Sequence, residues 1–217
     1  MWNAIKYSWI DQKLQRSVKK KYYHHHLFCE LDQTLLTAYL FKSPYKISKQ
    51  YLKDRNEKEI HVYGETPLQT YEKIAEKGGL QPKDVVLELG SGRGRGAFFI
   101  HSFFQCQVIG IERIPYFAKM SRYLSRKYCK KEVSFICADM LEVDFPKATF
   151  VYLYGTMLRE QEIGILIEKL KKLPKGTKIV TISYPLTDYH PTAFCNDSCF
   201  PVEFLWGKTD AYLQRVG

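Results

Sequence analysis

The chain has 217 residues, of which 45% are hydrophobic, and its formal net charge is +10. A chain of this length buries one good core and leaves no room for a second catalytic domain. It holds no apolar run of about eighteen residues for a membrane span, and residues 1–11 lack the layout of a secretory signal. We therefore expect a soluble, cytoplasmic protein with one α/β domain and an additional segment.

Residues 1–60 are more basic than the rest of the chain. They hold twelve Lys or Arg against six Asp or Glu, a net of +6, whereas residues 61–217 hold 21 against 17, a net of +4. Apolar side chains recur in this segment at helical spacing, at Leu31, Leu35, Leu36, Tyr39 and Leu40. This spacing predicts two or three amphipathic helices, which we interpret as a helical lid for substrate recognition over the domain formed by residues 61–217. The run His24–His26 has no acidic or cysteine partner nearby, so we expect a solvated helix face there and no metal site.

A helix is expected just after residue 66. Thr66 can cap it, with Pro67 at its first position and Gln69 completing a capping box, and Gly78-Gly79 should end it. The segment before this helix then lies about two dozen residues ahead of a glycine-rich loop.

The glycine-rich loop follows an apolar strand that begins at Val85. Glycines without side chains let the backbone turn sharply and approach a ligand, while an acid just before them can accept hydrogen bonds from an ammonium group. These residues are Glu88, Gly90, Ser91, Gly92 and Gly94. The stretch predicts a site for a cofactor that carries adenosine. The loop alone is not specific, because the frame Gly92, Gly94 and Ala97 also fits a dinucleotide fingerprint.

Two later strands end in acidic residues. A helix over 97–104 leads to a strand over 107–111 that ends in Glu112, at the spacing where an acid receives ribose hydroxyls. The next strand, over 133–137, is followed by Asp139 and Met140, which we interpret as an adenine-binding pair. The alternatives are a solvated strand end for Glu112, turn chemistry for Asp139 and core packing for Met140.

The C-terminal third completes the sheet. The expected elements are a strand over 149–154, a helix over 158–173, a strand over 177–184, and a hairpin of 200–206 with 211–216 joined by 207–210. Strands alternating with helices predict a mostly parallel, Rossmann-like sheet, to which the hairpin adds antiparallel strands at one edge.

The order of these pieces resembles the class I S-adenosylmethionine-dependent methyltransferases, over about residues 63–217. The combination of Glu88-x-Gly90-x-Gly92-x-Gly94 with Glu112 and Asp139 carries the resemblance. It implies the class I methyltransferase fold, S-adenosyl-L-methionine as cofactor and an enzyme that transfers methyl groups. Residues 61–217 would then be the S-adenosylmethionine-binding methyltransferase domain.

Tyr63-Gly64-Glu65-Thr66 also resembles the segment before this loop in the disruptor-of-telomeric-silencing histone lysine methyltransferases. The resemblance implies that Tyr63 and Thr66 contact the cofactor. The fourth strand departs from that family, because residues 150–156 lack its paired asparagines. It is closer to the small protein-lysine methyltransferases of prokaryotes and mitochondria, which modify membrane-associated proteins.

The same strand excludes other acceptors. It has neither the Asn- or Asp-Pro-Pro-aromatic turn of enzymes that methylate planar amides nor the nucleophilic cysteine of cytosine C5 enzymes. A lysine amine, with an ordinary pKa of about 10.4, must lose a proton, and an apolar aromatic channel favours that loss. Tyr154, Tyr184 and Trp206 are candidates for the walls, and Tyr154 is our candidate catalytic residue.

A basic helix keeps a second class of acceptor open. Residues 113–131 contain seven basic and no acidic residues, while Tyr116, Phe117, Met120, Tyr123, Leu124 and Tyr128 are expected to face inward. This surface could meet RNA phosphates or be merely solvated. We therefore expect a protein substrate, with an RNA or small-molecule methyltransferase and a non-catalytic cofactor-binding protein as alternatives. The residues predict no particular oligomeric state.

Overall fold

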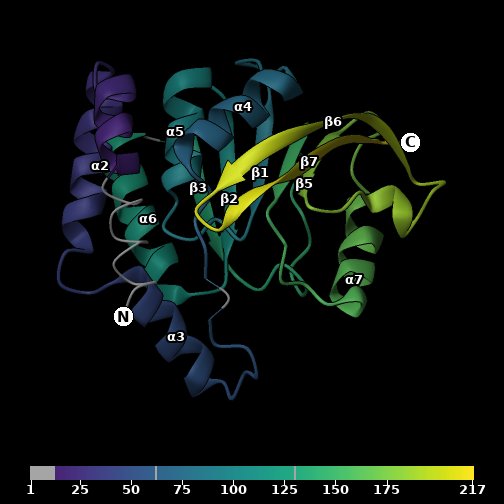
Figure 1. Cartoon of the computed structure of the whole chain (residues 1–217), viewed down its shortest axis with the longest axis horizontal. Helices are drawn as coiled ribbons and strands as arrows, with labels where there is room; N and C mark the ends of the chain where they lie inside the picture. The colour runs from purple at the N-terminus through teal and green to yellow at the C-terminus, as the bar shows by residue number, and fades with distance from the viewer. Residues whose placement is uncertain (1–12, 62, 130) are drawn as a thin grey trace.

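The computed structural model describes residues 13–61, 63–129 and 131–217, which form one twisted sheet flanked by helices (Figure 1). The strands are β1 (Val85–Leu89), β2 (Gln107–Glu112), β3 (Val133–Cys137), β4 (Phe150–Leu153), β5 (Lys178–Ile182), β6 (Phe194–Phe204) and β7 (Gly207–Val216). Their order is β3-β2-β1-β4-β5-β7-β6, with β7 antiparallel between β5 and β6 and the first five strands parallel. The prediction of a mostly parallel sheet with a C-terminal antiparallel hairpin is confirmed.

Helices cover both faces of the sheet. They are α2 (His26–Ala38), α3 (Pro44–Asp54), α4 (Leu68–Gly78), α5 (Arg95–Phe104), α6 (Pro115–Tyr128), α7 (Glu160–Leu170) and the short 3-10 helix η1 (Leu186–Asp188), and residues 13–22 are also helical. Alternate strand residues face opposite sides, so Val86 packs in the core under α4, α5 and α6, whereas Leu87 packs in the core under α7. Among the described helices, none is long and apolar enough to cross a membrane.

The N-terminal helices form an outer layer. α2 packs on α5 and α6, and its buried residues include Phe28, Leu31 and Leu35 (Figure 1). The prediction of amphipathic helices in residues 1–60 is confirmed for the part of this segment that the structure describes. The lid role stays a prediction, and the contact that bears on it is the ion pair between Asp32 of α2 and Arg95.

Two local predictions are wrong. Thr66 does not cap α4: the helix begins after Pro67, and the Thr66 hydroxyl instead bonds to the Tyr152 hydroxyl at 2.7 Å. The hairpin turn falls at residues 205–206 instead of 207–210, because β7 already pairs with β6 from Gly207 onward. At Thr66 a contact with a residue distant in the chain outweighs the local sequence preference.

The inward face of α6 also differs from the prediction. Phe117 and Leu124 are buried as expected, but Tyr116 and Tyr123 are 36% and 57% exposed. Ser125 lies on the buried face, where it donates a hydrogen bond to the Val133 carbonyl of β3. A small residue whose hydroxyl is satisfied by the sheet lets the helix approach closely, so the bulky tyrosines lie outside.

Gly96 permits the close packing of α5 against α4, because a Cβ there would overlap the ring of Tyr71. Gly96→Ala is therefore expected to lower the free energy of unfolding by about 1–3 kcal/mol, measured by urea unfolding. Gly164, on α7, is the matched control, since a Cβ there meets nothing within 4 Å. Gly164→Ala should raise the same free energy by up to about 1 kcal/mol through helix propensity. Equal shifts in the two variants would contradict this account.

Candidate active site

The glycine loop connects β1 to α5 and turns through left-handed backbone conformations. The φ angles of Gly90, Gly92 and Gly94 are 79°, 55° and 76°, which side chains disfavour. The backbone N–H groups of Gly90 and Ser91 donate to the carbonyl of Ile111 on β2, at 2.9 and 3.0 Å. A Cβ at Gly90 would meet nothing within 4 Å, so open space lies beside the loop at this point. The loop is thus fixed to the sheet on one side and free to approach a ligand on the other.

Glu112 ends β2 and holds the same loop. Its Oε2 accepts a hydrogen bond from Gly92 N and its Oε1 accepts one from Ile114 N, both at 2.7 Å. Burial raises the pKa of this carboxyl, while the two backbone hydrogen bonds oppose the rise. Each carboxylate oxygen can accept a further hydrogen bond, so the side chain can still receive ribose hydroxyls.

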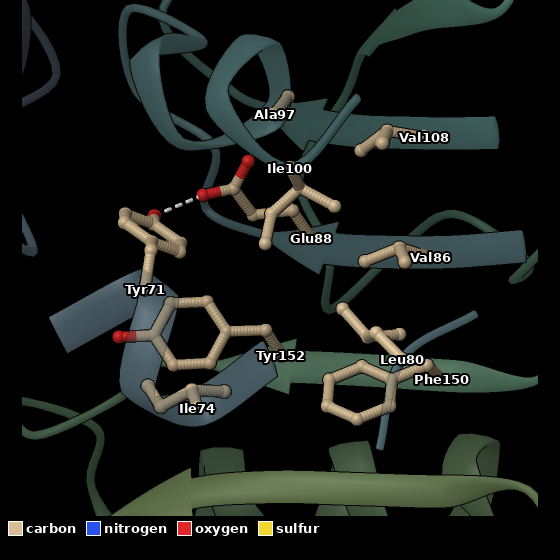
Figure 2. Close-up of a pocket in the computed structure, with 10 residues that line it drawn as sticks. All are labelled: Tyr71, Ile74, Leu80, Val86, Glu88, Ala97, Ile100, Val108, Phe150 and Tyr152. Carbon is tan, nitrogen blue, oxygen red and sulfur yellow. Dashed lines mark hydrogen bonds between the residues drawn. The ribbon is translucent and has the colours of Figure 1, made fainter. Parts of the chain in front are cut away.

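Glu88 lies beneath the loop at the wall of an apolar pocket (Figure 2). The hydroxyl of Tyr71, on α4, donates to Oε1, while Oε2 is buried and has no hydrogen-bond partner among the described residues. Burial raises the pKa of Glu88 to about 8; the nearby Glu112 adds to the rise and the hydrogen bond from Tyr71 opposes it. A buried acceptor without a partner fits a site that receives a cationic group.

This carboxyl is expected to make the free energy of unfolding of the ligand-free protein depend on pH. Glutamate in an unfolded chain has a pKa of about 4.3, whereas the folded-state pKa of Glu88 is raised to about 8. The folded state therefore holds an extra proton between these values. The stabilisation is complete below about pH 4 and is lost as the pH rises through the folded-state pKa.

The glutamine of the Glu88→Gln variant cannot ionise. Between about pH 5 and pH 8 the unfolding free energy of this variant should therefore fall less than that of the unaltered protein, and the difference between the two falls should be a few kcal/mol at most. Denaturant unfolding at each pH measures the difference. Parallel curves for the two proteins would contradict the raised pKa.

Residues 63–66 form a strap across the loop. Glu65 binds Arg93 through two hydrogen bonds of 2.6 Å and also accepts one from the Tyr63 hydroxyl at 2.5 Å. Burial alone would raise the pKa of Glu65, but the charge and hydrogen bonds of Arg93 outweigh it and hold the pKa below its ordinary value. A Cβ at Gly92 would lie 3.4 Å from the Tyr63 hydroxyl, so the strap packs directly on the glycine loop.

Tyr154 follows β4 and begins an aromatic wall. Its hydroxyl accepts a hydrogen bond from Trp206 Nε1 at 2.7 Å, and its ring lies 5.1 Å from that of Phe204. Phe204 in turn stacks on Trp206 at 5.3 Å, so the three rings run from the pocket to the exposed Trp206. Tyr184 does not join this wall: its hydroxyl reaches the Gly155 carbonyl at 3.4 Å, and its ring belongs to the core under α7.

One pocket is lined by residues of the strap, of the glycine loop and by Tyr154 of the aromatic wall. It is lined by Tyr63, Gly64, Glu65, Thr66, Tyr71, Gly90, Ser91, Gly92, Arg93, Arg95, Gly96, Tyr152 and Tyr154. Glu88 reaches it through its bond to Tyr71, Glu112 through its bond to Gly92, and Gly94 begins α5 below it.

Two of the expected residues, Asp139 and Met140, neither line this pocket nor form a described hydrogen bond to a residue that lines it. Asp139 Oδ1 accepts from Leu141 N at 2.9 Å and its Oδ2 lies 3.7 Å from Arg113, which is the turn chemistry weighed as the alternative. Met140 packs at the edge of the core under α7. Their assignment to the adenine ring remains a prediction.

Four residues that line the pocket were not predicted from the sequence: Arg93, Arg95, Tyr71 and Tyr152. Arg93 and Arg95 interrupt the glycine pattern, and their role depends on acids distant in the chain. One signal was available: Asp32 is a charged residue among the apolar positions of its helix, and it is fully buried. A buried carboxylate requires a cation, and that cation is Arg95.

The pocket fits S-adenosylmethionine. Its glycine loop has open space at Gly90, Glu88 offers an unpartnered buried acceptor, and Glu112 ends the neighbouring strand beside the loop. Glu88 would hold the ammonium group and Glu112 the ribose hydroxyls.

Comparison with known proteins agrees with this fit. Residues 88–193 match the family model of the ANTKMT methyltransferase domain. Sterol 24-C-methyltransferase ERG6 of Saccharomyces cerevisiae is 30% identical over 119 residues, which are 53% of this chain and 31% of the yeast protein. The chain thus spans about a third of the length of that curated relative.

Solved structures share the fold. TrmN from Thermus thermophilus matches with a TM-score of 0.62 and 14% identity, over 72% of this chain and 51% of TrmN. An RNA methyltransferase from Salinibacter ruber, solved with S-adenosyl-L-homocysteine, matches with a TM-score of 0.53 and 25% identity, over 70% of this chain and 93% of that one. The strand order, the glycine loop and these matches agree on the class I S-adenosylmethionine-dependent methyltransferase fold, with S-adenosylmethionine as the cofactor.

Proposed function

We propose that this protein transfers a methyl group from S-adenosylmethionine to the side-chain amine of a lysine in a protein substrate. The observation that carries the proposal is the aromatic wall of Tyr154, Phe204 and Trp206, which starts in the cofactor pocket and ends at the surface. The match to the ANTKMT methyltransferase domain supports it, as does the resemblance of the fourth strand to small protein-lysine methyltransferases.

The wall suits a lysine for two physical reasons. An apolar aromatic channel removes water from an ammonium group, which lowers its pKa and favours the neutral, nucleophilic amine. Aromatic faces also attract a methylated ammonium product. The bound cofactor supplies a methyl carbon to which the amine nitrogen forms a bond as the carbon–sulfur bond breaks, leaving S-adenosylhomocysteine and a protonated methylamine. Tyr154 would orient the amine, and neither Tyr154 nor its neighbours need act as a base.

An RNA acceptor is the second candidate. Lys119, Arg122, Arg126 and Lys127 are all exposed on α6, and a basic stripe of this kind can bind phosphates. One of the matching solved structures is an RNA methyltransferase. Small-molecule acceptors enter through the partial similarity to a sterol methyltransferase.

The test is to incubate the purified protein with methyl-labelled S-adenosylmethionine and cell extract, then treat matched portions with protease or nuclease. Label that protease releases supports the lysine proposal, and mass spectrometry then identifies the modified residue. Label that nuclease releases, with a yield that falls steeply with salt, would replace it with the RNA function. Transfer to neither fraction, despite cofactor binding, would contradict both.

A further inference from the structure

Two arginines with little exposed side chain line the cofactor pocket, and each is paired with an acid. Arg93 is 7% exposed and binds Glu65 of the strap. Arg95 binds Asp32 of α2, at 2.7 Å from Nε and 2.8 Å from Nη2, and its Nη2 also donates to Gln15 at 3.0 Å. Buried cations require such partners, so both guanidinium groups are held firmly in place.

Each acid binds its own arginine, and both acids bind along the edge formed by Nε and Nη2. Both use Nε and Nη2, so Nη1 of Arg93 and Nη1 of Arg95 have no hydrogen-bond partner within the described ranges. Arg93 and Arg95 line the pocket, whereas Asp32 reaches Arg95 from the N-terminal layer and is not among the lining residues. Each arginine is thus held through its Nε and Nη2 atoms, and its Nη1 group is left as a charged donor.

The start of α5 adds positive potential at the same place. The helix begins at Arg95, its N-cap Gly94 has no capping side chain, and its first turn holds no acidic residue. The first N–H groups of a helix favour an anion. Glu65 is the only acid among the described residues that line this pocket, and it is already bound to Arg93, so no lining carboxylate is left to pair with a further donor. Glu88 reaches the pocket only through Tyr71.

We propose that Arg95, with Arg93 beside it, binds the α-carboxylate of the cofactor's methionine part through the free Nη1 donors. Asp32 is then a positioning residue, through which the N-terminal segment takes part in cofactor binding. The proposal depends on the cofactor and not on the acceptor, so failure of the lysine hypothesis would leave it intact.

The first experiment tests whether the unaltered protein recognises the carboxylate of the cofactor. Isothermal titration should give a dissociation constant for decarboxylated S-adenosylmethionine at least about 10-fold higher than for S-adenosylmethionine, because a charged hydrogen bond is lost. Equal affinities would overturn the proposal without any substitution.

The second experiment uses a double variant to test whether the pair of Asp32 and Arg95 provides this recognition. Asp32→Asn with Arg95→Gln removes both buried charges together, so neither charge is left unpaired. We expect its affinity for S-adenosylmethionine to fall about 10- to 100-fold, with little change for the decarboxylated compound. Equal losses for both ligands would mean that the pair only supports the fold, and would overturn the proposal.

The matched control is Asp197→Asn with Arg215→Gln, an exposed pair on the C-terminal hairpin with an Nε–Oδ2 distance of 2.6 Å. Its affinities for both compounds should stay unchanged. Thermal unfolding with and without ligand confirms that each variant is folded before it is titrated.

Discussion

Replacing Tyr154 by alanine is expected to reduce methyl transfer at least about 100-fold while leaving the affinity for S-adenosylmethionine within a few-fold. Tyr154 follows β4, lines the pocket and contacts Phe204 and Trp206, so its loss would remove the wall that we propose orients the acceptor amine. Misplacement of a reacting group by about 1 Å can cost this much. Single-turnover transfer of labelled methyl groups, compared with equilibrium binding of the cofactor, measures the two effects separately.

Two further variants show which part of the side chain matters. Tyr154→Phe keeps the ring and loses only the hydrogen bond from Trp206 Nε1, so its transfer rate should fall much less than that of the alanine variant. Tyr189→Ala removes a tyrosine that is 42% exposed and contacts Tyr184 outside the aromatic wall, and should leave transfer unchanged. A Tyr154→Ala protein with normal transfer would remove the wall from the mechanism.

Glu112→Ala is expected to have the larger effect on the cofactor itself. The substitution removes the acceptor for ribose hydroxyls at about 1.5–3 kcal/mol per charged hydrogen bond, and it also releases Gly92 N and Ile114 N, to which the carboxylate is bound at 2.7 Å. The dissociation constant for S-adenosylmethionine should rise at least about 10-fold, as measured by titration calorimetry. Unchanged affinity would refute the ribose assignment.

Asp139→Ala is the informative comparison, because Asp139 also follows a strand but bonds to its own turn. A small change in affinity would leave it a turn residue, whereas a loss similar to that of Glu112→Ala would restore its predicted role at the adenine ring.

The parts of the fold that sequence predicted are those encoded locally. The strands before Gly90 and Glu112 are short apolar runs with polar ends, and the carboxyl ends of parallel strands meet at one edge, so their grouping follows from the pattern. Gly90, Gly92 and Gly94 were identified because glycines that follow an apolar strand allow a sharp turn, and the structure gives all three positive φ angles.

The parts that sequence did not predict depend on distant partners. The bond between Thr66 and Tyr152 joins residues 86 positions apart, and no local pattern indicates that it replaces a helix cap. The exposure of Tyr123 depends on how closely α6 approaches β3, which Ser125 decides. In the sequence, Arg95 only interrupts the glycine pattern. Its function as a paired cation becomes visible only when Asp32 is seen beside it in the structure.

The pairing of Asp32 with Arg95 also has a consequence for the order in which the molecule assembles. The two residues are 63 positions apart, so α2 leaves the ribosome well before its partner is synthesised. Docking α2 at that stage would bury a carboxylate without a cation, at a cost of several kcal/mol. We therefore expect α2 to dock only after the glycine loop that carries Arg95 has formed.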